Sequence, residues 1–236
     1  MAGDPHYCGA PAWTVETLYL RRTTPEYRQA FDLAVSGCQP EAEPVLVVSS
    51  SAIHAVELLK RCRAPLYFAG TGAFDAVQFA AEASHWAWGL IKPVRLATHD
   101  QRYSTMIWAE PEAASAAETL QALSRLAARG ATLSVIASAP LRRFLPAWQA
   151  SPFPAERPLA AGRVGRLLSS RGWQIDQRIV FHGPRSIFWS YLARVADRIR
   201  RPDWGDRCLF AMRRTYLEPG WLWPLAPLAL IQARAA

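Results

Sequence analysis

The middle of the chain alternates short continuous apolar runs with longer segments in which apolar residues recur every three or four positions. The apolar runs predict strands buried on both faces of a sheet, and the longer segments predict amphipathic helices. The expected strands are residues 45–49, 65–69, 94–98, 105–109 and 132–137, and the expected helices are 51–62, 71–88 and 111–129. This alternation predicts parallel strands joined by right-handed crossovers.

The pattern is weaker on both sides of this block. Residues 1–43 form a polar leader with six acidic residues and three arginines, and residues 24–35 within it are expected to form a helix. After residue 138, five prolines interrupt the chain before a helix at 162–171, an alternating strand at 173–181 and a last strand at 228–233. We therefore expect an N-terminal leader with a helical extension, 1–43, and one α/β domain, 44–236.

Composition adds little to this picture of a globular protein. The net charge of +8 comes almost entirely from arginine, because Lys60 and Lys92 are the only lysines. Arginine prefers carboxylate and phosphate partners, although a compositional bias of the genome would produce the same excess. Four scattered cysteines without metal spacing, no signal peptide, and an apolar stretch at 221–231 that is too short to span a bilayer predict a cytoplasmic protein without a metal site.

The order of the elements over residues 44–236 resembles the class I S-adenosylmethionine-dependent methyltransferase fold. The most telling part runs from Thr105 to Ala137, where an apolar strand, a helix rich in alanine and leucine, and Gly130 before the next strand follow one another. Gly172 and Trp173 resemble the glycine–aromatic start of the sixth strand. The resemblance implies a Rossmann-like, mostly parallel seven-stranded sheet with helices on both faces and an antiparallel last strand.

The resemblance also implies a site for S-adenosylmethionine at the carboxyl ends of the strands. The matching cofactor positions are Ser49 and Ser51 after the first strand, Gly70 and Gly72 after the second, and Asp100 after the third, while Glu110 and His99 are the candidate catalytic residues. The first turn lacks the glycine that normally allows close approach of a cofactor. Its serines can instead cap the next helix, and His99 can be an ordinary surface histidine.

Two functions of different classes follow from these observations. The first is methyl transfer from S-adenosylmethionine to an unidentified small-molecule acceptor. The alternative, favoured by the missing glycine turn, is a catalytically inactive methyltransferase-fold protein that acts as a binding or structural subunit of a larger complex, including one at a membrane. Several other enzyme classes are excluded, because the sequence has no GxxxxGK[ST], no GxSxG and no tyrosine four residues before a lysine.

A helical insert at about residues 183–224 is the most distinctive segment. Apolar residues from Ile187 to Ile199 recur at helical spacing, with Arg194, Arg198 and Arg201 beside them. Such a basic amphipathic pair of helices can cover the cofactor cleft, dock on a protein complex through residues 184–224, or make peripheral contact with a membrane. A nucleic-acid partner is not expected, because acids interleave with the basic residues.

Overall fold

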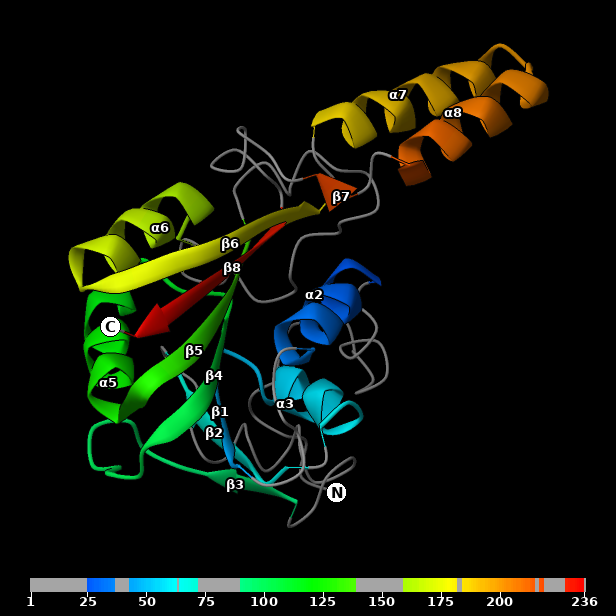
Figure 1. Cartoon of the computed structure of the whole chain (residues 1–236). Coiled ribbons are helices and arrows are strands. Elements are labelled where there is room, and N and C mark those ends of the chain that lie inside the picture. Colours follow the sequence, from blue (N-terminus) through cyan, green and yellow to red (C-terminus); the bar gives the residue numbers. More distant parts are fainter. Residues whose placement is uncertain are drawn as a thin grey trace, which may run out of the picture.

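The computed structural model describes residues 25–36, 43–62, 64–71, 90–138, 159–181, 184–214, 217–218 and 228–235. A single twisted sheet runs through the centre of this part of the chain (Figure 1). Its strands are β1 (Val45–Ser49), β2 (Leu66–Gly70), β3 (Ile91–Pro93), β4 (Tyr103–Ala109), β5 (Ala127–Ser138), β6 (Trp173–Phe181), β7 (Leu217–Glu218) and β8 (Leu228–Ala235).

The strand order is β3-β2-β1-β4-β5-β8-β6-β7. Neighbouring strands from β3 to β5 pair in parallel, whereas β8 is antiparallel to both β5 and β6. The expected mostly parallel sheet with an antiparallel last strand is therefore confirmed. The two-residue strand β7 extends it at the edge by pairing with the end of β6.

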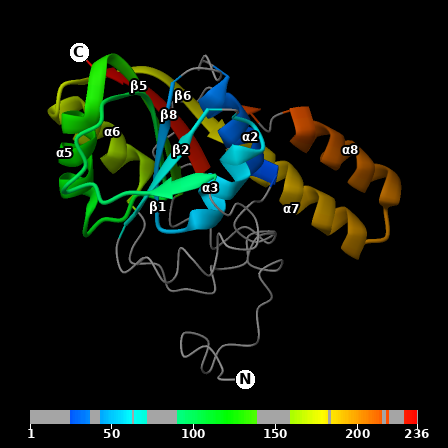
Figure 2. The same ribbon diagram turned by 90° about the horizontal axis from the view of Figure 1, so that it is seen from below.

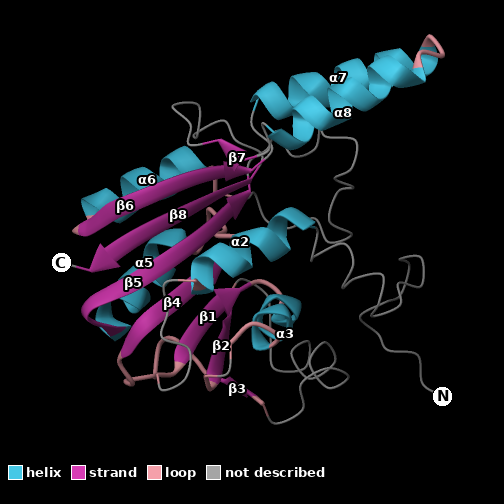
Figure 3. Ribbon diagram, turned by 45° about the vertical axis from the view of Figure 1, so that its right-hand side comes forward, coloured by secondary structure: helices cyan, strands magenta, loops and turns pink. Residues whose placement is uncertain are grey.

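Helices cover both faces of the sheet (Figure 3). The helices are α2 (Pro25–Val35), α3 (Ala52–Leu59), α5 (Ala116–Leu126), α6 (Ala161–Ser170), α7 (Pro184–Arg198) and α8 (Pro202–Arg214). Helices α2 and α3 pack on one face with Val45 and Val47, while α5 and α6 pack on the other with Leu46 and Val48. Successive residues of a strand point to opposite faces, so the continuous apolar run of β1 supplies both cores at once.

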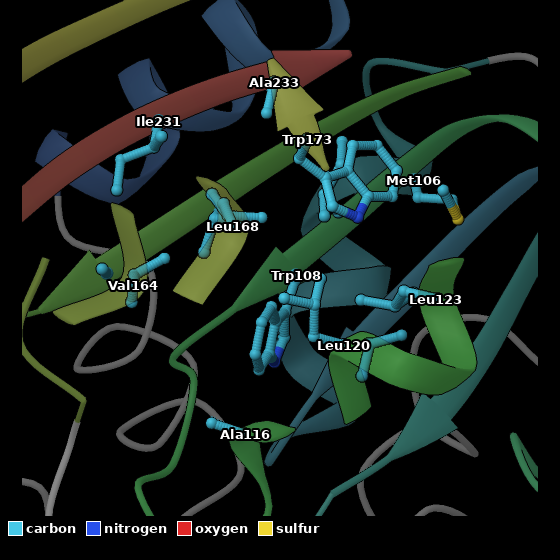
Figure 4. Close-up of a cluster of buried hydrophobic side chains, with 14 of the residues drawn as sticks. Met106, Trp108, Ala116, Leu120, Leu123, Val164, Leu168, Trp173, Ile231 and Ala233 are labelled. Atoms are coloured by element: carbon cyan, nitrogen blue, oxygen red, sulfur yellow. The ribbon is translucent and has the colours of Figure 1, made fainter. Parts of the chain in front are cut away.

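The core on the α5 and α6 face is built around Trp108 of β4 (Figure 4). Leu120 and Leu123 reach it from α5, and Val164 and Leu168 reach it from α6, all of them fully buried. Complete burial of such a side chain contributes about 1.5–3 kcal/mol relative to leaving it in water. The helical spacing of these residues in the sequence is the reason that they meet on one face.

Helix α2 of the N-terminal extension belongs to the opposite core. Ala30 and Phe31 are fully buried there, among residues of α3 and the central strands. The Gln232 side chain of β8 donates a hydrogen bond from Nε2 to the carbonyl oxygen of Leu33, at 3.3 Å. The extension therefore packs against the same sheet that the rest of the chain forms.

Two sequence-based elements were wrong in position. The third strand is Ile91–Pro93 and not 94–98, because the Arg95 carbonyl accepts hydrogen bonds from the amides of Thr98 and His99 and forms a turn. The helix expected at 111–129 covers only Ala116–Leu126, and Gly130, with φ of +72°, lies inside β5 rather than after the helix. The helix expected at 71–88 lies outside the described residues, apart from Thr71.

Gly130 occupies an irregularity in the ladder between β4 and β5. Tyr103 is opposite Ala127, but Thr105 is opposite Thr132, so two steps along β4 face five along β5. The extra residues form a bulge, and a positive φ within it is easiest for glycine. The same glycine signal therefore marks a bend in a strand here and not the end of a helix.

Candidate functional site

The carboxyl ends of β1, β2 and β4 meet at one edge of the sheet. Ser49, the last residue of β1, is opposite Gly70 on one side and Ala109 on the other. Glu110 follows Ala109 directly, and its amide donates to the carbonyl oxygen of Ile136 at 2.9 Å. The structure thus brings together Ser49, Gly70 and Glu110, as expected for residues at the carboxyl ends of neighbouring parallel strands. Open α/β sheets bind their ligands at this edge.

The turn after β1 is held closed by its own side chains. The Ser49 hydroxyl is hydrogen-bonded to Nδ1 of His54 in α3 at 2.6 Å, and it also accepts from the backbone amide of Ser51 at 3.2 Å. Ser49, Ser51 and His54 are fully buried, and the His54 ring lies 5.7 Å from the ring of Phe31. The Ser49 hydroxyl is therefore already engaged by partners within the chain.

This arrangement agrees with the interpretation that the serines cap the next helix. Ser51 directly precedes α3, and its carbonyl oxygen accepts from the His54 amide at 3.3 Å. The Ser49 hydroxyl satisfies an amide at the start of the helix and links the strand to the α3 layer. Direct contact of Ser49 and Ser51 with a cofactor remains a prediction.

The end of β2 presents a different chemistry. Gly70 is exposed, and the amide of the next residue, Thr71, donates to the carbonyl oxygen of Ser49 at 3.1 Å. The Thr71 hydroxyl oxygen is buried, and within the described part of the chain it has no hydrogen-bond partner. A buried hydroxyl without a partner is unfavourable, and such groups are candidates for ligand contact. Gly72, the other glycine expected here, lies outside the described residues.

Glu110 has a strained backbone. Its φ is +53°, in the left-handed region that only a few per cent of non-glycine residues adopt. The side chain is half-buried at the carboxyl end of β4. Strained backbone of this kind is common at functional sites, because the surrounding structure must hold it in place. This feature supports the choice of Glu110 and was not visible in the sequence.

His99 and Asp100 do not belong to this edge. The expectation placed them at the carboxyl end of a third strand, but they lie in the connection that enters β4. The His99 Nε2 atom is hydrogen-bonded at 2.6 Å to the hydroxyl of Tyr103, the first residue of β4. They therefore lie at the amino end of β4, away from the edge where Ser49 and Glu110 meet. The misplaced strand is the cause of this error.

The residues around His99 form an aromatic cluster. Its ring lies 5.7 Å from that of Tyr103 and 5.9 Å from that of Tyr67. Burial raises the pKa of the Tyr103 phenol above its ordinary value of 10.0, and the nearby Tyr67 phenol adds to the rise. His99 therefore packs against two tyrosines near the amino ends of β2 and β4.

A charged cluster on the outer side of α2 and α3 was not anticipated from the sequence. The buried Glu57 carboxylate lies 3.3 Å from Nζ of Lys60 and 3.9 Å from Nε of Arg28, and it also pairs with Arg61. These residues and Asp32 line an open hollow of about 380 Å³. Arg28 and Asp32 of α2 pair with Glu57 and Arg61 in and just after α3, and that proximity appears only after folding.

Neither a metal-ligand cluster nor a membrane-spanning helix occurs in the described residues. Among them, no group of three or more histidine, cysteine or acidic residues could hold a metal ion. Cys62 and Cys208 are buried free thiols. Of the helices described, none combines the length and the apolar character that crossing a membrane requires.

Comparison with known proteins identifies the fold. No family model matches the sequence, and no curated protein is similar to it in sequence. In structure, the chain is similar to geranyl diphosphate C-methyltransferase from Streptomyces coelicolor in complex with S-adenosyl-L-homocysteine, with a TM-score of 0.53, 12% identity, and coverage of 99% of this chain and 88% of that one.

Two further structures show how varied the similar proteins are. Magnesium protoporphyrin IX methyltransferase from Synechocystis with bound S-adenosylmethionine has a TM-score of 0.52 at 12% identity, with coverage of 98% of this chain and 88% of that one. The [4+2]-cyclase SpnF has a TM-score of 0.51 at 14% identity, with coverage of 88% and 81%. The chain therefore has the class I methyltransferase fold, and a fold of this kind leaves the reaction open.

Proposed function

We propose that this protein binds S-adenosylmethionine at the carboxyl edge of β1, β2 and β4 and transfers its methyl group to a small-molecule acceptor. The observation that carries the proposal is the composition of that edge. The strained residue Glu110 and the buried Thr71 hydroxyl, which has no partner in the described part of the chain, lie there in a fold shared with proteins that bind this cofactor.

The residues at this edge fit the cofactor by their chemistry. The Thr71 hydroxyl can both donate and accept, so it suits the ribose hydroxyls that the resemblance places after the second strand. Gly70 has no side chain to obstruct close approach. The amides at the start of α3 suit the carboxylate of the cofactor, because helix N-termini favour anions. Ser49 fixes the shape of the turn through its hydrogen bond to His54.

The protein's part in the reaction would be to position the two partners. When bound, the cofactor supplies an electrophilic methyl group on a sulfonium ion. Glu110 would orient the acceptor at the end of β4. Its carboxylate would take the proton that the nucleophilic atom of the acceptor loses. Fixing two reactants in a productive geometry supplies much of the acceleration in reactions of this type. His99 and Asp100 have no part in this assignment, because they lie at the opposite end of β4.

A second function, a non-catalytic binding subunit, is favoured by one specific observation. The turn after β1 contains no glycine, Ser49 and Ser51 within it are fully buried, and the Ser49 hydroxyl is bonded to His54. A turn closed in this way leaves less room for a cofactor than a glycine-rich turn. Under this alternative, the fold would serve as a scaffold and the edge would bind no cofactor.

Calorimetric titration of the full chain with S-adenosylmethionine and with S-adenosylhomocysteine distinguishes the two functions. Micromolar binding of either compound supports the proposal, and the Glu110→Gln variant should retain it, because Glu110 is assigned to the acceptor. Absence of binding at millimolar ligand contradicts the proposal and favours the scaffold. The matched control is Glu118→Gln, which makes the same change at an exposed position of α5.

A further inference from the structure

The α7–α8 hairpin projects from one end of the sheet (Figure 1, Figure 2). The two helices contact each other through small residues. A Cβ atom placed on Gly205 of α8 would be 3.7 Å from the Cβ atom of Ala196 in α7. Ala193, Ala196, Gly205 and Cys208 are buried between the helices. Small side chains therefore form this contact between the two helices.

Many large apolar side chains of the hairpin are exposed. Seven of the eight exposed large hydrophobic residues in the described part of the chain lie here: Phe188, Tyr191, Val195, Ile199, Trp204, Leu209 and Phe210. The first four, which we call the α7 stripe, follow one another at intervals of three, four and four residues, so they share one side of α7. Phe188 is 57% exposed and Ile199 is 54% exposed. A contiguous exposed apolar surface of this kind marks an interaction site.

Positive charge borders the stripe. Residues 184–214 contain eight arginines and three aspartates, a net charge of +5. Arg194 and Arg198 are exposed and immediately precede Val195 and Ile199, so they stand along one side of the stripe. The guanidinium of Arg214 in α8 lies over the Phe210 ring, 4.7 Å from its centroid. Apolar side chains flanked by arginines match an anionic lipid surface, with acyl chains below and phosphates at the level of the headgroups.

We propose that the α7–α8 hairpin binds the surface of anionic membranes, with the α7 stripe inserted at the interface and Arg194 and Arg198 on the phosphates. Charge complementarity favours an anionic membrane over a second copy of the chain. A second copy of the chain would bring two hairpins of net charge +5 together, and like charges at an interface oppose association. The hairpin would lie in the plane of the interface, and the proposal does not depend on whether the carboxyl edge binds a cofactor.

Vesicle co-sedimentation of the full chain tests the proposal with three double variants. Phe188→Ser with Ile199→Ser removes the apolar ends of the stripe, and Arg194→Glu with Arg198→Glu reverses the charge beside it. Arg163→Glu with Arg166→Glu makes the same change of charge on exposed positions of α6 and is the matched control. All of these side chains are exposed, so the variants should fold, which thermal melting followed by circular dichroism verifies.

Wild type and control should bind vesicles of phosphatidylcholine mixed with phosphatidylglycerol more strongly than vesicles of phosphatidylcholine alone, and binding should weaken as salt is raised. Each hairpin variant should reduce the partition coefficient by about tenfold or more. Equal binding to both vesicle types, no binding by wild type, or equal losses in the α6 control and the α7 charge variant would overturn the proposal. A wild-type dimer that becomes monomeric in the stripe variant, measured by light scattering, would overturn it in favour of a second copy.

Discussion

Substitution of Thr71 by valine should change folding stability and cofactor binding in opposite directions. Thr71 is 7% exposed, and its buried hydroxyl has no partner among the residues that the structure describes. Valine has nearly the same shape and lacks the hydroxyl. The substitution therefore removes one polar group from the carboxyl end of β2 and leaves the backbone bond from the Thr71 amide to Ser49 in place.

The effect on stability follows from the burial of this hydroxyl. An unsatisfied buried polar group costs about 1–3 kcal/mol, and the lower figure applies to a residue with some remaining exposure. Thr71→Val should therefore raise the free energy of unfolding by about 1 kcal/mol. For a chain of this size, that change corresponds to an increase in Tm of about 2–4 °C. Thermal unfolding followed by circular dichroism measures it directly.

The effect on binding has the opposite sign. If the Thr71 hydroxyl bonds to the ribose of S-adenosylmethionine, its loss removes a hydrogen bond with a net value of about 1 kcal/mol, which raises Kd about fivefold. Calorimetric titration of wild type and variant measures the ratio. Thr98→Val is the control and should change neither quantity, because Thr98 is exposed in the turn after β3.

Two results would refute this reasoning. A decrease in stability of 1 kcal/mol or more (about the value of a made hydrogen bond) would mean that the hydroxyl has a structural partner in the folded protein. An unchanged Kd, with wild-type binding established, would mean that Thr71 does not contact the cofactor. The two measurements are independent, so each part of the argument can fail alone.

Three further substitutions test other contacts. Ser49→Ala should destabilise the protein by about 2 kcal/mol, because it removes the bond to His54 and the cap on α3; an unchanged denaturation midpoint would show that neither contact matters. Because burial raises the pKa of Tyr103, the folded protein holds its proton while the unfolded chain releases it near pH 10, so stability should fall as pH rises past about 10. Tyr103→Phe should reduce that alkaline loss and, by removing the bond to His99, cost about 1 kcal/mol at neutral pH; unfolding measured across pH would contradict this if both proteins declined alike. Gly172→Ala should cost about 1–2 kcal/mol, because φ at this position is +80°, and a smaller change in urea denaturation would mean that the turn rearranges.

The sequence predicted the strand ends better than the contacts at them. The apolar run of β1 and the alternating pattern of β6 gave the observed bounds, Val45–Ser49 and Trp173–Phe181. Because parallel strands end at a common edge, Ser49, Gly70 and Glu110 were correctly expected to come together. The apolar pattern of the sequence and the shared edge of parallel strands were sufficient to predict these positions.

The same reasoning misplaced His99 and Asp100. Val94 and Leu96 are partly buried against the α5 and α6 core, so their pattern resembles that of a strand, although the backbone there is irregular. Whether a loop lies at the amino or the carboxyl edge depends on where the preceding strand stops. β3 ends at Pro93, and the connection then lies beside α5, where Arg125 donates to the Ala97 carbonyl oxygen, before it enters β4.

The sequence by itself determined which residues are apolar, in what period, and therefore the order of strands and helices and both cores of the sheet. The tertiary structure alone decided which polar groups acquire partners. Ser49 is bonded to His54, Glu57 of α3 pairs with Arg28 of α2 and with Arg61 just after α3, and Glu110 is held at a positive φ. It also decided that the α7 stripe is exposed rather than packed on the sheet. Periodicity is a local property of the chain, whereas burial and partnership depend on what distant segments bring to the same place.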